Sequence, residues 1–595
     1  MAPSGPLRIG AITRALAATQ LAALILAPLG VAPLLAARTP PRARLASVAP
    51  ADLRRIAAAY YDSAKVNFPV GSSSQGLHTW DDRLTDYRPA AIEARRAYVQ
   101  RLLAQVRAID TAKWSRDDQV DWVLFRSQLE AAEFYNRVFD GEHVDPQTYV
   151  GEISGGIFSL LTKDYAPARQ RALAATARLR ATPAMLRQGE ANLTKPVALY
   201  AKLAIDAARG GDELYTVSLM TLAKDLSPAE RAALVAARDS AVAALHSYAD
   251  WLAAREKSMP PWRAMGTANY EYMLHHIYLL PMTADQLNTI GQTELARYRA
   301  LEAMLPDPRL ANPDPMRAPR IPKDQADFLK TYQAREKEVI DFIQAKKLVT
   351  LPSYIGPFYI RQLPEAFKPT NPGGFMNPPG LYDKDPSGFY FIPTYNPKSN
   401  NFYIRAGIED PRPLIVHEGF PGHFVQLSIS NHVADEIRRQ HGDGVFAEGW
   451  ALYLEELMLH EGLIAENAGG HGQVLRLSRY RAARVGVDAN LHTGKWTFDQ
   501  AVQYFMNEGG LDREAAEGEA AGAASQPTQK MTYIVGKLGF MRLLGRYRDA
   551  HPNDYRLGAF HDQVISYGTL PQSVIEWLMF NDPTSVKQAT RQDTP

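Results

Sequence analysis

Apolar residues recur at three- and four-residue spacing over most of the chain after residue 50, with charged residues between them. This period places the apolar side chains on one face of an α-helix. The pattern predicts helices over residues 52–68, 90–109, 229–257, 282–295 and 324–348. Ser227, Pro228 and Glu230 form a capping-box start for the third of these helices. Further helices are predicted over residues 411–419, 446–462, 473–492, 497–510 and 529–551.

Between residues 352 and 413 the chain instead becomes rich in Pro, Gly, Asn and aromatic residues. Two short strands are expected there, Gly388–Thr394 and Asn401–Gly407, joined by a turn-forming linker into a hairpin. The proline-rich segment Pro306–Pro322 is expected to be a surface loop. The pattern therefore predicts a mainly α-helical protein with one small antiparallel sheet beside its most histidine-rich segment.

The composition of the chain limits the classes of partner and of metal ligand that the protein can have. The chain has 595 residues, of which 46% are hydrophobic and 22% charged, as in ordinary folded proteins. Its net charge of +2 and the lack of a basic run interleaved with aromatics give no support for a nucleic-acid partner. Cysteine is absent, so any metal must be held by His, Asp or Glu.

The N-terminus has the pattern of a secretory signal. Arg8 and Arg14 precede the apolar, small-residue-rich segment Ala15–Ala37, which contains two prolines. We expect residues 1–37 to be a signal peptide and the mature protein to be exported, periplasmic or secreted, with no stable membrane insertion. The alternative is an uncleaved N-terminal anchor.

The heptapeptide HEGFPGH, residues 417–423, nearly matches the zinc-protease motif H-E-x-x-H but spaces its histidines six apart. In an ideal helix that spacing would aim the two side chains about 120° apart. Pro421 cannot continue a regular helix, and the glycines Gly419 and Gly422 admit unusual backbone angles. The segment is either a kink that returns His417 and His423 to one side or a helix break carrying two chance histidines.

Glu448 favours the first interpretation. It opens a strongly helical segment 25 residues after His423, and a glutamate from a following helix is the expected third ligand of a His, His, Glu zinc site. Its alternative role is to favour the helix N-terminus through the dipole. Glu455, seven residues later on roughly the same face, is either a partner for a ligating histidine or, as we slightly favour, solvated.

Three segments together resemble a bacterial family known as domain of unknown function 885: HEGFPGHFVQ (417–426), FAEGWALYLEEL (446–457) and QPTQKMTYIVG (526–536). Members carry H-E-x-x-P-G-H, E-G-W-A-L-Y and P-G-Q-x-x-x-Y-x-x-G elements in this order. The family is regarded as akin to helical zinc metallopeptidases of the gluzincin type. One departure is Thr528, which stands where the family has Gly.

The resemblance implies a large two-lobed helical fold with a deep central cleft. On this basis we expect residues 38–595 to form a single catalytic domain, with an N-terminal lobe over about 45–350 and an active-site lobe over about 351–595. Carried over to this sequence, the zinc ligands would be His417, His423 and Glu448, and the general base Glu418.

Metal-assisted peptide hydrolysis also needs a donor for the developing oxyanion. Tyr533, which falls in the third family-like segment, and His492 are our candidates. The same segment retains Gln529, which we expect to contact substrate. The alternative roles are structural: core packing for Tyr533, and helix capping or surface packing for His492.

Other residues are candidates for binding the peptide. Arg484 would suit a substrate carboxylate, as a carboxypeptidase requires, although an Arg484–Asp488 helix pair is the common alternative. The predicted strand NFYIR would hold an extended peptide by strand addition, with Tyr403 and Arg405 on one face. His441, His460 and His471 lack partners at ligand spacing and are expected to be surface or packing residues.

The leading hypothesis is an exported metallopeptidase that uses one Zn²⁺ ion to hydrolyse oligopeptides. Two alternatives stay open: a non-catalytic relative that binds peptides or a protein partner, and a zinc amidase acting on non-peptide amides. Nitrogen and oxygen ligands also accept Mn²⁺ or Co²⁺. The sequence leaves the choice between exo- and endopeptidase action open, as well as the oligomeric state.

Overall fold

The structure is a computed structural model that describes residues 48–305, 321–364, 373–399 and 401–591. The predicted signal peptide, residues 1–37, lies outside the described residues, as does all but the end of the predicted loop Pro306–Pro322. Within the described ranges no helix is both long enough and apolar enough to cross a bilayer.

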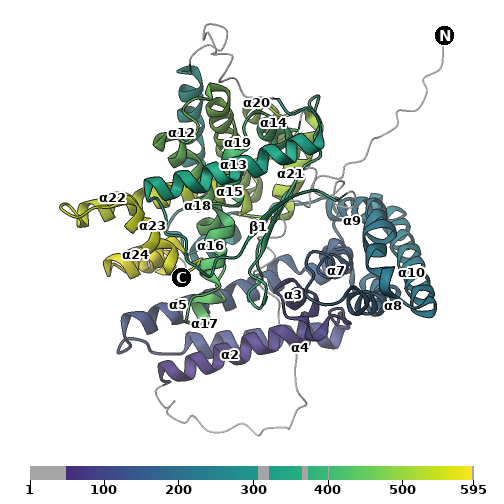
Figure 1. The fold of residues 1–595 in the computed structure, drawn as a ribbon. Coiled ribbons are helices and arrows are strands. Elements are labelled where there is room, and N and C mark those ends of the chain that lie inside the picture. The colour runs from purple at the N-terminus through teal and green to yellow at the C-terminus, as the bar shows by residue number, and fades with distance from the viewer. Residues whose placement is uncertain (1–47, 306–320, 365–372, 400, 592–595) are drawn as a thin grey trace, which may run out of the picture.

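The described chain is mainly helical, as the periodicity predicts (Figure 1). The helices before the sheet are α2 Pro50–Asn67, α3 Pro69–Ser74, α4 Pro89–Arg107, α5 Arg116–Phe134, α6 Gly141–Val144, α7 Gln147–Phe158, α8 Ala168–Asn192, α9 Ala198–Gly210, α10 Pro228–Ala253, α11 Thr267–Tyr272, α12 Ala284–Ala303 and α13 Gln325–Lys346. Short 3₁₀ or π turns connect several of them. The predicted capping box opens α10 at Ser227, and another opens α12 at Thr283.

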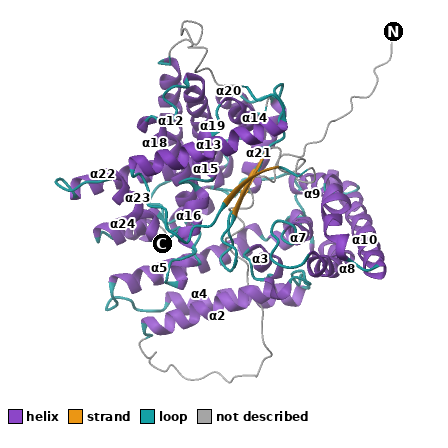
Figure 2. Cartoon of the chain, in the orientation of Figure 1, coloured by secondary structure: helices purple, strands orange, loops and turns teal. Residues whose placement is uncertain are grey.

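The second half of the chain contains the sheet and the remaining helices. These elements are β1 Phe358–Gln362, β2 Phe375–Asn377, β3 Gly388–Ile392, α14 Phe402–Glu409, α15 Arg412–Glu418, α16 His423–Ser430, α17 Glu436–Arg439, α18 Gly444–Glu461, α19 Ala468–Thr493, α20 Phe498–Gly509, α21 Arg513–Ser525, η8 Gln529–Met531, α22 Thr532–Ala550, α23 Leu557–Ser566, α24 Gln572–Phe580 and α25 Thr584–Arg591. Helices surround the short strands on several sides (Figure 2).

The predicted antiparallel hairpin is wrong. Only its first strand exists, as β3, which pairs in parallel with β1 and antiparallel with β2 in the order β1-β3-β2. The predicted second strand is helix α14 because the Asn401 side chain accepts the N–H groups of Tyr403 and Ile404 and so caps a helix there. The observed sheet is therefore small and mixed.

The hydrophobic core crosses residue 350, where the sequence suggests a boundary between lobes. The largest buried cluster joins Leu53 and Phe125 of the N-terminal helices to Trp450 and Phe540 of α18 and α22. A second cluster unites α7 to α10 with phenylalanines on β2 and β3. The long helices α18 and α22 pack against each other, as do α12 and α19.

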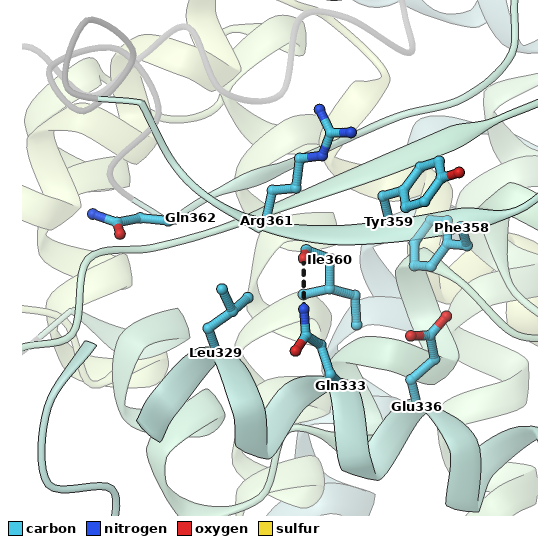
Figure 3. Close-up of a pocket in the computed structure, with 8 residues that line it drawn as sticks. All are labelled: Leu329, Gln333, Glu336, Phe358, Tyr359, Ile360, Arg361 and Gln362. Atoms are coloured by element: carbon cyan, nitrogen blue, oxygen red, sulfur yellow. Dashed lines mark hydrogen bonds between the residues drawn. The ribbon is translucent and has the colours of Figure 1, made fainter. Parts of the chain in front are cut away.

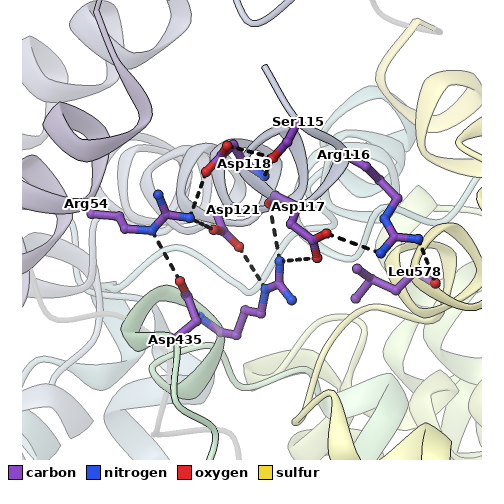
Figure 4. A network of polar contacts seen from close by, with 9 residues as sticks. Arg54, Ser115, Arg116, Asp117, Asp118, Asp121, Asp435 and Leu578 are labelled. Carbon is purple, nitrogen blue, oxygen red and sulfur yellow. Dashed lines mark hydrogen bonds and ion pairs between the residues drawn. The ribbon is translucent and has the colours of Figure 1, made fainter.

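An ion-pair network also joins distant parts of the chain (Figure 4). Arg54 of α2 contacts Asp118 and Asp121 of α5, and Asp435 at the start of α17. Arg438 of α17 donates to Asp121 at 2.8 Å. Because the side chain of Asp121 is 1% exposed, this carboxylate ties the N-terminal helices to the segment that follows α16.

Candidate metal centre

His417, His423 and Glu448 converge on one point. Their candidate ligand atoms all lie within 4.8 Å of one another, and all three residues are buried. Glu448 Oε2 lies 3.6 Å from His417 Nε2 and 3.4 Å from His423 Nε2. The last turn of α15, the first residue of α16 and the first turns of α18 therefore place the predicted ligands together.

The backbone between the two histidines is a sharp turn, as the Pro and Gly residues predict. Helix α15 ends at Glu418 and α16 begins at His423, with a cis peptide bond between Phe420 and Pro421. A Cβ atom at Gly422 would collide with the carbonyl oxygen of His417. The turn therefore requires glycine at this position because the two helix ends approach so closely.

The second family-like segment supports this turn and aims Glu448 at it. The indole Nε1 of Trp450 donates to the carbonyl oxygen of Pro421 at 2.9 Å. Gly449 lies against Gly536, and a Cβ at either glycine would collide with the backbone of the other helix. These two motif glycines therefore let α18 and α22 pack closely enough to bring Tyr533 near Glu448.

Glu455 is a partner of a candidate ligand, and the expectation that it is solvated is wrong. Its side chain is fully buried, and its Oε1 accepts from His417 Nδ1 at 2.6 Å. Arg481 of α19 donates to the same carboxylate at 3.0 Å. Burial alone would raise the pKa of Glu455, but Arg481 and His417 outweigh it and lower the pKa. Since His417 Nδ1 carries the donated proton, its Nε2 is left to face Glu448.

Glu418 lies half-buried at the end of α15. In the described part of the chain its carboxylate has no hydrogen-bond or ion-pair partner. Burial and, among smaller causes, the charge of Glu418 raise the pKa values of Tyr332 and Tyr390, so the carboxylate lies near these two buried tyrosines. A carboxylate that directly follows a candidate ligand in the chain and has no protein partner among the described residues is suited to take up a proton.

Tyr533 lies beside the three candidate ligands. Its ring stacks on that of His417, with centroids 6.5 Å apart and an interplanar angle of 21°. Burial, and then the charge of Glu448, raise the pKa of Tyr533 well above its usual value, so the hydroxyl stays protonated. Gln529 Nε2 donates to this hydroxyl at 3.3 Å, which leaves the phenolic proton for another acceptor.

Of the residues predicted to bind substrate, Tyr403 also belongs to this neighbourhood. It lies on α14, near enough to Tyr533 and Arg481 to be a minor influence on their pKa values, after burial and the charges of Glu448 and Glu455 respectively. Arg405, on the same helix, is exposed. Because this segment is a helix, the predicted strand addition along NFYIR does not apply.

Arg484 does not form the helix pair with Asp488 that was the alternative to a substrate-binding role. It forms an ion pair with Glu519 of α21 at 3.0 Å and donates to the hydroxyl of Tyr480. Asp488 instead accepts the backbone N–H groups of Thr528 and Met531 and the hydroxyl of Tyr270. Burial raises the pKa of Asp488 to about 7.

Thr528, the departure from the family pattern, has φ +69°. This left-handed conformation is the one that glycine adopts freely, which explains the glycine of the family element.

His492 lies away from the three candidate ligands and the residues that surround them. It lies eleven residues after Arg481 on α19, roughly 16 Å along the helix. Its Nε2 contacts the carbonyl oxygen of Ala523 at 2.8 Å, and its ring stacks on Tyr270. Burial lowers its pKa to about 4. The structure thus places His492 in helix packing, away from the candidate ligands.

The other three histidines fit their expected packing or surface roles. His441 is buried and contacts the side-chain amide of Gln128, whereas the side chain of His460 is 75% exposed. His471 is partly exposed.

An open cavity of about 400 Å³ lies between α13 and β1 (Figure 3). Its lining comprises Leu329, Gln333, Glu336, Phe358, Tyr359, Ile360, Arg361 and Gln362. None of the three candidate ligands lines it, although Phe358 packs on Phe420, in the turn between the two histidines, and on Phe424 of α16. Burial raises the pKa of Glu336 to about 7. The deep central cleft remains a prediction.

The profile of a family described as bacterial protein of unknown function (DUF885) matches residues 69–579. The chain belongs to this family. No curated protein matches the sequence. Two solved structures share the fold. One, described as "a putative lipoprotein of unknown function" from Shewanella oneidensis, is 24% identical with a TM-score of 0.70, over 89% of this chain and 99% of that one. The other, from Colwellia psychrerythraea and also described as a "putative lipoprotein", is 17% identical with a TM-score of 0.71, over 91% and 99%.

Sequence reasoning named the three candidate ligands but missed residues that support them. The spacing of Glu455 from Glu448 signalled its position, yet not its burial. Nothing local indicated that Trp450 would bond to Pro421 or that Glu519 would pair with Arg484, because these partners come from different helices.

Proposed function

We propose that this member of the family is a zinc-dependent metallopeptidase that hydrolyses peptide bonds of oligopeptides. The convergence of His417, His423 and Glu448 at one buried point carries the proposal. These three residues would hold one Zn²⁺ ion, Glu418 would be the general base, and Tyr533 would donate to the oxyanion.

The donor set fits zinc. Zinc bonds to imidazole nitrogen and carboxylate oxygen are about 2.0–2.2 Å long, so two ligands of a tetrahedral site lie about 3.3–3.5 Å apart. Of the separations between Glu448 Oε2 and the two histidine nitrogens, the 3.4 Å to His423 falls within this range and the 3.6 Å to His417 lies just above it. Glu448 Oε2 is also buried without a hydrogen bond in the described part of the chain, as a metal-binding oxygen would be.

Glu418, Tyr533 and the zinc site would each have a separate role in peptide hydrolysis. A bound zinc ion would acidify a water and polarise the scissile carbonyl. Glu418 accepts the proton of the attacking water and delivers it to the leaving amine nitrogen. The hydroxyl of Tyr533 donates to the carbonyl oxygen as negative charge develops there.

The wider setting is part of the proposal. It places the site in a cleft of a two-lobed, peptidase-like fold, with residues 38–595 as one catalytic domain. Export to the periplasm or secretion is supported by the signal-like pattern of residues 1–37 and by the description of the structural relatives as lipoproteins.

Metal content and hydrolysis test this function together. Wild-type protein should bind one zinc ion per chain by elemental analysis, and His423→Ala should lose it. Glu418→Gln should keep the zinc but lower the turnover of a quenched fluorescent peptide by about 10²- to 10⁴-fold. Glu514→Gln, an exposed glutamate on α21, is the matched control and should behave as wild type. Zinc at well below one ion per chain in both wild type and His423→Ala would exclude the metalloenzyme. Unchanged turnover in Glu418→Gln would remove this residue from its role.

A further inference from the structure

Three buried cations lie beside the candidate metal centre. Arg481, Arg484 and Lys530 are 2%, 4% and 4% exposed, respectively. Arg481 and Arg484 come from successive turns of α19, and Lys530 comes from η8. Burying this much positive charge is costly unless anions compensate it.

The carboxylates of the protein compensate it only in part. Glu455 pairs with Arg481, but it also accepts from His417. Glu519 is shared, since it lies 3.0 Å from Arg484 and 3.1 Å from Lys530. In the described part of the chain these two cations therefore divide a single carboxylate.

Asp488 acts on the cluster only from beyond ion-pair distance, through its effect on Lys530. Its two carboxylate oxygens accept backbone N–H groups at the start of η8, at 2.9 and 3.0 Å. No ion pair joins it to Arg484 or Lys530 within the described residues. In ion pairs the cluster thus has three cations for two carboxylates, an arrangement that is complementary to an anionic group of a ligand.

The position of the cluster indicates which ligand group would reach it. The guanidinium carbons of Arg481 and Arg484 lie 5.3 and 5.4 Å from the ring centroid of Tyr533. The same ring lies 6.5 Å from that of His417. The side chain of Tyr533 therefore lies between the two arginines and the candidate metal centre. The surface that remains exposed at the metal centre and at the cation cluster belongs to their carboxylates, since the side chains of Glu448 and Glu519 are 12% and 22% exposed.

We propose that Arg484 and Lys530 bind the free α-carboxylate of a peptide substrate, so that the enzyme removes one or two residues from a C-terminus. This inference rests on the proposed peptidase function and names its substrate class. An extended residue spans at most about 3.6 Å, so one or two residues are in scale with the 5.4 Å from Arg484 to the ring of Tyr533 and the 6.5 Å from that ring to His417. Water adds across that bond, giving a new carboxylate on the longer fragment and a free amine on the released product.

Two peptides of one sequence, one with a free C-terminal carboxylate and one with a C-terminal amide, test the proposal. We expect the free acid to be cleaved with a kcat/KM roughly 10- to 100-fold higher, since a charge-assisted hydrogen bond is lost with the amide. Mass spectrometry should show the release of one or two C-terminal residues.

Single variants locate the effect. Arg484→Gln and Lys530→Met each leave Glu519 with one remaining cation, so both should fold and keep their zinc. Each should raise the KM for the free acid and reduce its preference over the amide, and Arg484→Lys should restore part of it. Arg476→Gln is the matched control, because Arg476 lies on the same helix with its side chain 43% exposed.

The possible outcomes distinguish a failure of the carboxylate site from a failure of the proposed peptidase function. Equal cleavage of both peptides by a zinc-loaded enzyme overturns the carboxylate site and leaves the peptidase intact. An amidated peptide ending in Glu that is cleaved as well as the free acid shows recognition of a side-chain carboxylate, which overturns the C-terminal assignment. Cleavage of neither peptide, with no bound zinc, overturns both proposals.

Discussion

Glu455 and Glu456 are adjacent buried glutamates on α18 with different partners. Glu455 accepts from His417 Nδ1 at 2.6 Å and pairs with Arg481 at 3.0 Å. Glu456 pairs instead with Lys537 at 3.1 Å and Arg297 at 2.8 Å, and it contacts none of the candidate ligands. Replacing each by Gln preserves shape and removes the charge, so the pair separates the effect on the metal from the effect on stability.

Both substitutions should destabilise the protein. Each leaves a buried cation without its full counter-charge: the side chain of Arg481 is 3% exposed and that of Lys537 is 0% exposed. Breaking a buried ion pair costs about 3–5 kcal/mol. We therefore expect a comparable decrease in the free energy of unfolding of the metal-free protein for Glu455→Gln and Glu456→Gln, measured by urea denaturation.

Zinc affinity should respond to Glu455 alone. The carboxylate orients the His417 ring and increases the basicity of its Nε2, and loss of such a partner weakens metal binding about 10- to 100-fold. This corresponds to about 1.4–2.7 kcal/mol. Competition with a chelator of known affinity measures the zinc Kd, which should change less than twofold in Glu456→Gln. An unchanged Kd in Glu455→Gln, or an equal loss in both variants, would refute the assigned role of Glu455.

The remaining predictions concern packing, pH and catalysis. Gly536→Ala should lower the free energy of unfolding, measured by urea denaturation, by about 1–3 kcal/mol because its Cβ would collide with the carbonyl of Val445. Gly545→Ala on the same helix meets no neighbour and should raise this free energy by about 0.5–1 kcal/mol. Burial lowers the pKa of His561 to about 4. The neutral form of His561 therefore contributes up to about 3 kcal/mol of stability above pH 6.5, and this contribution is lost as the pH falls towards 4. His561→Gln should flatten that decline. An identical pH profile of the unfolding free energy for variant and wild type would contradict this. Tyr533→Phe should retain zinc and lower kcat by about 10²- to 10³-fold in the peptide assay, and a change below twofold would exclude the hydroxyl as an oxyanion donor.

Much of the helical framework was predictable because its determinants are local. The apolar period and the capping box at Ser227 depend on residues within a few turns, and the structure places α10 where they indicate. The turn in HEGFPGH was predictable for the same reason, since Pro421 cannot continue a regular helix whatever its surroundings.

The Asn401–Gly407 segment shows where the pattern misleads. Its aromatic and β-branched residues suit a strand, but Asn401 caps a helix, and the buried positions Ile404 and Ala406 then face the core from α14. The strands that pair with β3 come instead from earlier in the chain, Phe358–Gln362 and Phe375–Asn377. Short apolar runs are ambiguous, so tertiary packing decides between helix and strand.

The sequence by itself determined the helix periods, the break between His417 and His423, and the identity of the ligand candidates, because these depend on side-chain chemistry and neighbouring backbone. Only the tertiary structure decided that Glu455 is buried against His417, that His492 lies in helix packing, and that Arg484 pairs with Glu519. These partners belong to different helices, and which of their faces meet depends on how α15, α18, α19 and α21 pack together.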